Sequence, residues 1–194
     1  MAIFKKDYSK IADENLLKLI VQQDDLAFEA LYERYKIRLY RYFIRMCGNE
    51  TQAQDLLQDL FLRLFQKADL YEERYKFSTW IYTMAYRLFI NQVRKKSFAR
   101  MVTEENIQLD NTYTSDDVNT FESALEHKFF KEKLDVVLQT FDAEKFNTFI
   151  LRFQQGLNVS EIADIMECPV GTVKSRLHYT IKEISHQMAA YKEI

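Results

Sequence analysis

Apolar residues recur at helical spacing in several segments of the chain. They stand at Phe28, Leu31, Tyr32, Tyr35, Leu39 and Phe43; at Leu56, Leu57, Leu60, Phe61 and Leu64; at Trp80, Ile81, Met84, Ala85 and Leu88; and at Phe146, Phe149, Ile150 and Phe153. Steps of three and four residues place such side chains on one face of an amphipathic helix. The pattern therefore predicts a helix in each of these segments.

Glycine and proline are scarce, and this scarcity sets the fold class. The chain has 194 residues, of which three are glycine and one is proline, and 47% are hydrophobic. Hairpins and tight βα turns need these residues, so few turns of that kind can form. We predict an all-α fold. The same composition excludes collagen-like, disulfide-rich and low-complexity classes.

The charge changes sign abruptly near residue 100. Residues 74–100 contain seven basic side chains and no acidic one, whereas residues 101–122 contain six acidic side chains and no basic one. The acidic stretch is rich in Asn, Thr and Asp and shows no sustained apolar period. We predict two small helical domains, residues 10–96 and 123–190, joined by an acidic linker over residues 97–122. The simplest interpretation of that linker is a solvated tether.

No motif for catalysis, metal binding or membrane insertion stands out. Cys47 and Cys168 are far apart in sequence, and the three histidines, His127, His178 and His186, form no ligand cluster. The first residues lack the apolar core of a signal peptide, and no run approaches the ~18 apolar residues that span a bilayer. We expect a cytoplasmic protein without membrane insertion, without catalytic or metal-binding residues and without a cofactor.

Residues 155–184 have the pattern of a helix-turn-helix. Ser160 can cap a short first helix whose inward face is Ile162, Ala163, Ile165 and Met166, and Pro169 can restart the chain as a second helix. The predicted buried face of that second helix consists of Val170, Val173, Leu177, Ile181 and Ile184. Its polar residues are Thr172, Lys174, Ser175, Arg176, His178, Tyr179 and Lys182. Such a helix can read base edges in the major groove, although a merely solvated face is the alternative.

These residues resemble a known family. Residues 160–163 and 169–176 are similar to the region 4 helix-turn-helix of the extracytoplasmic-function (ECF) sigma factors, whose second helix reads the minus-thirty-five promoter element. The resemblance implies this role for Lys174, Ser175, Arg176, His178 and Tyr179. Thr172 and Lys182, on the same helix, complete the predicted minus-thirty-five contacts. Glu167 and Cys168 stand where the family usually has a glycine in the turn.

The first domain carries a second resemblance. Asp55, Gln58, Asp59 and Leu62 recur at i, i+3, i+4 and i+7 and form one strip, which composition alone would describe as the surface of an amphipathic helix. The segment resembles sigma region 2.2. The resemblance implies that this strip binds the clamp helices of the polymerase β′ subunit.

The next helix resembles sigma regions 2.3 and 2.4, with Phe77, Thr79, Trp80 and Ala85 at family positions. Aromatic rings here interleave with cations, a combination that holds an opened DNA strand. Tyr75, Tyr82 and Tyr86 belong to this aromatic set. The predicted minus-ten contacts are Tyr71, Arg74, Lys76, Phe77, Trp80, Arg87, Asn91 and Arg94. The alternative is that Phe77 and Trp80 belong to the core.

Together the resemblances imply a sigma factor of the ECF class that binds core RNA polymerase, directs it to specific promoters and assists promoter melting. The implied partners are the β′ clamp helices for region 2, the β flap for region 4, promoter DNA and an anti-sigma factor. In the family, the linker runs near the polymerase active site and RNA exit path. A stand-alone DNA-binding regulator and a protein that sequesters another factor remain as alternatives.

Overall fold

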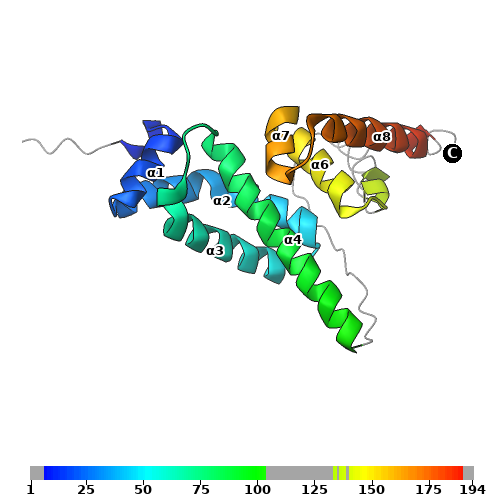
Figure 1. The fold of residues 1–194 in the computed structure, drawn as a ribbon, viewed down its shortest axis with the longest axis horizontal. Coiled ribbons are helices and arrows are strands. Elements are labelled where there is room, and N and C mark those ends of the chain that lie inside the picture. The colour runs from blue at the N-terminus through cyan, green and yellow to red at the C-terminus, as the bar shows by residue number, and fades with distance from the viewer. Residues whose placement is uncertain (1–6, 104–132, 135, 139, 190–194) are drawn as a thin grey trace, which may run out of the picture. The chain divides into compact units, whose positions relative to one another are not determined.

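The computed structural model describes residues 7–103, 133–134, 136–138 and 140–189, and for residues 96–103 it describes the backbone alone. Every regular element in those ranges is a helix. The helices group into two compact units, Met1–Asn111 and Thr112–Ile194 (Figure 1). The predicted all-α fold is confirmed.

The first unit is a helical bundle. Its elements are the short 3-10 helices η1 (Tyr8–Lys10) and η2 (Ala68–Leu70) and the α-helices α1 (Asp13–Val21), α2 (Asp25–Cys47), α3 (Glu50–Lys67) and α4 (Phe77–Thr103). α2 packs against α1 and α3, and α4 packs against α2 and α3. The bundle therefore presents the outer faces of α3 and α4 to solvent.

Local sequence signals set the turn between α2 and α3. Gly48 ends α2 in the left-handed conformation, with φ +65°, which glycine adopts at little cost. Asn49 follows, and its side chain accepts a hydrogen bond from the Gln52 amide at 3.0 Å. Two residues thus end one helix and begin the next, so α2 and α3 are antiparallel neighbours.

The core of the first unit lies where α2, α3 and α4 meet. Of the apolar positions predicted on α2, Leu31, Leu39 and Phe43 are fully buried, and Tyr35 is nearly so. Phe77 and Tyr82 of α4 are also fully buried. Each large apolar side chain removed from water stabilises the fold by roughly 1.5–3 kcal/mol, so this layer holds the two exposed helix faces in place.

The predicted linker begins too early. α4 continues past residue 97 and ends at Thr103, so the linker's first seven positions are helical. The remainder of the predicted linker lies outside the described residues. Its two interpretations, as a solvated tether or as a segment that runs near the polymerase active site and RNA exit path, stay predictions.

The second unit contains α6 (Ala143–Phe153), α7 (Val159–Met166) and α8 (Val170–Ala189), and each packs against the other two. Val137 and Leu138, which precede α6, are buried too. Phe153, predicted on the apolar face of its helix, is instead half exposed. In the part of the chain that the structure describes, no helix is both long enough and apolar enough to cross a membrane.

Candidate polymerase and DNA surfaces

Asn158, and not Ser160, caps the first helix of the helix-turn-helix. The Asn158 side chain accepts from the Glu161 amide at 3.0 Å, and the Glu161 carboxylate accepts from the Asn158 amide at 2.8 Å. This reciprocal capping box satisfies two backbone donors. The predicted cap at Ser160 is wrong by two residues, because Asn158 offers the same kind of acceptor with a glutamate three positions later.

The turn keeps the geometry that a glycine would favour. Glu167 ends α7 in the left-handed conformation, with φ +52°. The next amide, that of Cys168, donates to the Ala163 carbonyl at 3.1 Å, and the Pro169 carbonyl accepts from the Thr172 amide at 2.9 Å. The departure from glycine at this turn therefore leaves a tight helix-turn-helix intact, with local strain at Glu167.

The inward face of α8 differs in part from the prediction. Val173 and Leu177 are buried as expected, but Val170 and Ile181 are 41% and 44% exposed. Thr180 is fully buried in place of Ile181. The buried face of α8 therefore continues from Leu177 to Thr180, three residues later, and not to Ile181. Val170 is the first residue of the helix and stays exposed.

The outward face of α8 collects most of the predicted minus-thirty-five residues. The exposed members are Lys174, Ser175, His178, Tyr179 and Lys182. The Ser175 hydroxyl donates to the Thr172 carbonyl at 3.0 Å, and the His178 and Tyr179 rings meet edge to face at 5.5 Å. We call these five residues the α8 strip. It combines two lysines with hydrogen-bonding groups on one exposed face.

Arg176 does not belong to that strip. Its guanidinium pairs with the Glu144 carboxylate of α6 and lies 3.6 Å from the Cys168 sulfur. The Arg176 side chain is only 20% exposed. Burial also raises the pKa of the Cys168 thiol. Arg176 therefore joins α8 to α6, and its predicted contact with DNA stays a prediction.

The predicted polymerase residues form one exposed strip on α3. Asp55, Gln58 and Asp59 are exposed, and Leu62 is 56% exposed. The strip continues one step further to Phe65, which is 48% exposed and meets Phe28 of α2 edge to face. Phe65 lies three residues after Leu62, so helical spacing alone could have assigned it to the same strip. We call these five α3 residues the α3 strip; it combines two acidic side chains with two large exposed apolar ones on the same face.

The aromatic residues near the start of α4 separate into two groups. Phe77 and Tyr82 are fully buried, so the prediction of Phe77 as a DNA contact gives way to the core alternative. Tyr71 and Trp80 are half-buried, and their ring centroids lie 5.4 Å apart. The Tyr71 hydroxyl donates to the Tyr75 carbonyl, and burial raises the pKa of Tyr71. Tyr75 and Tyr86 are partly buried as well, so of the predicted aromatic set only Phe77 and Tyr82 belong fully to the core.

Exposed cations lie along α4 and on the loop before it. Arg87, Asn91 and Arg94 are all exposed along one side of α4, as the spacing predicts, and we call them the α4 strip. Arg74 and Lys76 are exposed on the 71–76 loop, which joins η2 to α4. Arg74 pairs with Glu72 at 2.6 Å and lies 4.8 Å from the centre of the Tyr75 ring.

Comparison with known proteins identifies the two units. Residues 31–99 match the Sigma-70 region 2 family, and residues 133–184 match Sigma-70 region 4. The ECF RNA polymerase sigma factor SigW of Bacillus subtilis is 30% identical over 168 residues, which cover 84% of this chain and 89% of SigW. The chain belongs to the ECF sigma factor family. The RNA polymerase sigma-H factor of Pseudomonas aeruginosa is 24% identical over 85% of this chain and 88% of its own length.

Solved sigma factors share the fold. RpoE of Bartonella quintana, in complex with the anti-sigma factor NepR, gives a TM-score of 0.72 at 18% identity over 84% of this chain and 96% of that one. CnrH, in complex with the cytosolic domain of CnrY, gives 0.67 at 17% identity over 93% and 99% of the two chains. In this sigma factor the α3 and α4 strips lie within the region 2 match, and the α8 strip lies within the region 4 match.

Proposed function

We propose that this sigma factor uses its three strips for three different partners. The α3 strip binds the β′ clamp helices of core RNA polymerase. The α4 strip, with Tyr71 and Trp80, holds the opened minus-ten strand, and the α8 strip reads the minus-thirty-five duplex. The observation that supports this division is chemical: one strip is acidic and apolar, whereas the other two carry cations and hydrogen-bonding groups.

The chemistry of each strip suits its partner. Exposed apolar residues beside acids favour a protein surface, where Leu62 and Phe65 become buried on binding. Arg87 and Arg94 can neutralise phosphates, and half-buried rings at their side can stack on unpaired bases. On α8, Lys174 and Lys182 lie on a helix of the kind that enters the major groove.

The remaining partners follow from the same family membership. RpoE of Bartonella quintana is bound to the anti-sigma factor NepR, and we propose an anti-sigma factor for this chain as well. Region 4 contacts the β flap. The sigma factor supplies binding and strand capture in the cytoplasm, and the polymerase supplies the chemistry, so the chain is not itself an enzyme.

Two multiple variants test this division. In the first, Asp55, Asp59 and Leu62 are changed to Ala; in the second, Lys174 and Lys182 are changed to Ala. The first should lose affinity for core polymerase at least tenfold, while the second keeps it and loses use of the minus-thirty-five element. The proposal fails if the α8 variant loses core binding and the α3 variant keeps it. Tight, specific duplex binding by the chain alone would instead favour a stand-alone regulator.

A further inference from the structure

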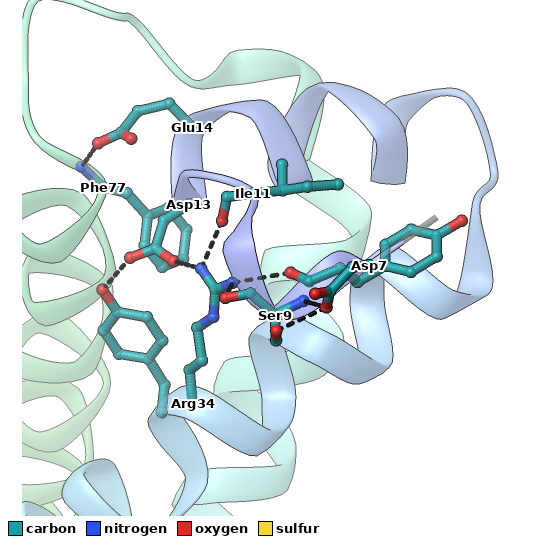
Figure 2. Close-up of polar contacts among 9 residues, drawn as sticks. Asp7, Ser9, Ile11, Asp13, Glu14, Arg34 and Phe77 are labelled. Atoms are coloured by element: carbon teal, nitrogen blue, oxygen red, sulfur yellow. Dashed lines mark hydrogen bonds and ion pairs between the residues drawn. The ribbon is translucent and has the colours of Figure 1, made fainter. Parts of the chain in front are cut away.

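A carboxylate from α1 caps the first turn of α4. The Phe77 amide donates to Glu14 Oε1 at 3.2 Å, across 63 positions of sequence (Figure 2). The first amides of a helix have no partner within that helix, and the residue before α4 is Lys76, whose side chain has no acceptor. Glu14 of α1 therefore supplies the acceptor that an N-cap side chain supplies at other helices.

A second contact joins α1 to the 71–76 loop. The Lys18 ammonium lies 2.6 Å from the Glu73 carboxylate. Both side chains are exposed, so this ion pair is weak by itself. Glu14 and Lys18 are one helical turn apart on α1, and they hold the two ends of the same segment: Glu73 in the loop, and Phe77 where α4 begins. The loop between these points carries Arg74 and Lys76.

α1 is itself fixed to the bundle. The Arg34 guanidinium of α2 donates to Asp13 Oδ1 at 2.6 Å, and to the carbonyls of Ile11, Ser9 and Tyr8 at 2.7 to 2.8 Å. Tyr35 donates to the other oxygen of Asp13 at 2.5 Å. Figure 2 shows Asp13 held by Arg34 beside Glu14, which reaches the start of α4. Neighbouring residues of α1 thus link α2 to the entry of the DNA-facing helix.

We infer that Glu14 is a positioning residue for promoter opening, an inference that rests on the proposed function. By fixing the start of α4 it holds Tyr71, Trp80 and the loop cations in the arrangement that receives an unpaired base. α1 lies before residue 31, where the region 2 match begins, whereas its contacts Arg34, Glu73 and Phe77 lie within the match. The Glu14 carboxylate accepts a hydrogen bond from a backbone amide at the N-terminus of α4, where the helix dipole stabilises a negative charge.

The test compares Glu14→Ala with Glu14→Gln in holoenzyme formed from the full chain and core polymerase. The probe is a duplex promoter mapped by run-off transcription, and opening is followed by permanganate reactivity of its thymines. Glu14→Ala should slow opening at least fivefold and leave core affinity within twofold. Glu14→Gln keeps an oxygen acceptor and should open within twofold of wild type. Asn15→Ala, an exposed neighbour on α1, is the matched control.

Hydrogen exchange of the free chain tests the contact without DNA. Amides in residues 71–80 should exchange at least threefold faster in Glu14→Ala, while those of α2 and α3 keep their rates. The inference is overturned if Glu14→Ala opens the promoter at the wild-type rate, if Glu14→Gln is as defective as Glu14→Ala, or if core binding falls in parallel with opening. A wild-type holoenzyme that opens no promoter overturns the proposed function and this inference with it.

Discussion

Arg176 of α8 forms an ion pair with Glu144 of α6, and this pair joins the second helix of the helix-turn-helix to the rest of region 4. Arg176 is 20% exposed, while Lys174, two residues earlier, points to solvent. Two neighbouring cations of one helix therefore have different structural roles. One stabilises the domain, and the other is available to a partner.

Replacing Arg176 and Lys174 separately should distinguish these roles. Arg176→Ala removes a half-buried stem and an ion pair, so it should lower the free energy of unfolding of region 4 by about 1 kcal/mol. Lys174→Ala should change it by less than about 0.5 kcal/mol. Urea unfolding followed by circular dichroism measures both. An Arg176→Ala protein as stable as wild type would contradict this assignment.

The left-handed conformation of Glu167 should make a glycine at this position more stable than an alanine. Glycine adopts φ +52° without the steric cost that a side chain brings, so Glu167→Gly should be more stable than Glu167→Ala by about 1 kcal/mol. Both variants lose the same carboxylate, and the difference isolates the backbone. Thermal unfolding should show the order glycine above alanine. The reverse order would mean that the turn relaxes without strain.

The sequence predicted the helices well, because amphipathic spacing is a local property. Leu31, Leu39 and Phe43 are buried where their spacing placed them. The surfaces that local pattern misjudged depend on distant partners. The Arg176 guanidinium meets Glu144, 32 positions away, and the Phe77 ring packs edge to face on Tyr35 of α2. The spacing of apolar residues within one helix carries no information about such contacts between helices.

Aromatic residues were the hardest to assign from the sequence. Tyr71, Phe77, Trp80 and Tyr82 are close together in the chain and chemically alike, yet two are fully buried and two are at the edge. Apolar residues occur on more than one side of the first turns of α4, so the spacing does not select the inward face. By contrast, all three residues of the α4 strip are polar, and their exposure agrees with what polarity and spacing predict.

Leu62 should matter for polymerase binding and little for stability. It is 56% exposed, so Leu62→Ala should change the free energy of unfolding by less than about 0.5 kcal/mol while weakening core binding at least tenfold. Leu60, two residues earlier, is fully buried, and Leu60→Ala should cost about 2–5 kcal/mol of stability. Equilibrium unfolding and fluorescence titration with core polymerase measure the two effects. Full core binding by Leu62→Ala would remove it from the interface.

Buried tyrosines predict a loss of stability at high pH. Burial raises the pKa of Tyr82 to about 12, although Arg38 opposes the shift, and the ordinary value is 10.0. The folded state keeps Tyr82 neutral, so its contribution is complete below pH 10 and is lost as the pH rises through 12. Tyr82→Phe cannot ionise. The free energy of unfolding of Tyr82→Phe should therefore fall less steeply than that of wild type between pH 10 and pH 12. The two slopes should differ by up to about 1.4 kcal/mol per pH unit.

Urea unfolding of both proteins at a series of pH values measures that slope. Between pH 7 and pH 9 the two curves should run parallel, which serves as the internal control. Burial and the Asp13 carboxylate also raise the pKa of Tyr35, and this contribution is common to both proteins. Equal slopes between pH 10 and pH 12 would show that Tyr82 ionises alike in the folded and unfolded chains.

The most direct measurement is run-off transcription on genomic fragments with purified chain and sigma-free core polymerase, followed by mapping of the start sites. If region 2 and region 4 each contact one promoter element, as the account holds, new starts appear that share two upstream elements at a fixed spacing. Loss of the α8 strip should weaken use of the upstream element, and loss of the α4 strip should impair opening at the downstream one. Starts no different from those of core polymerase alone would contradict it.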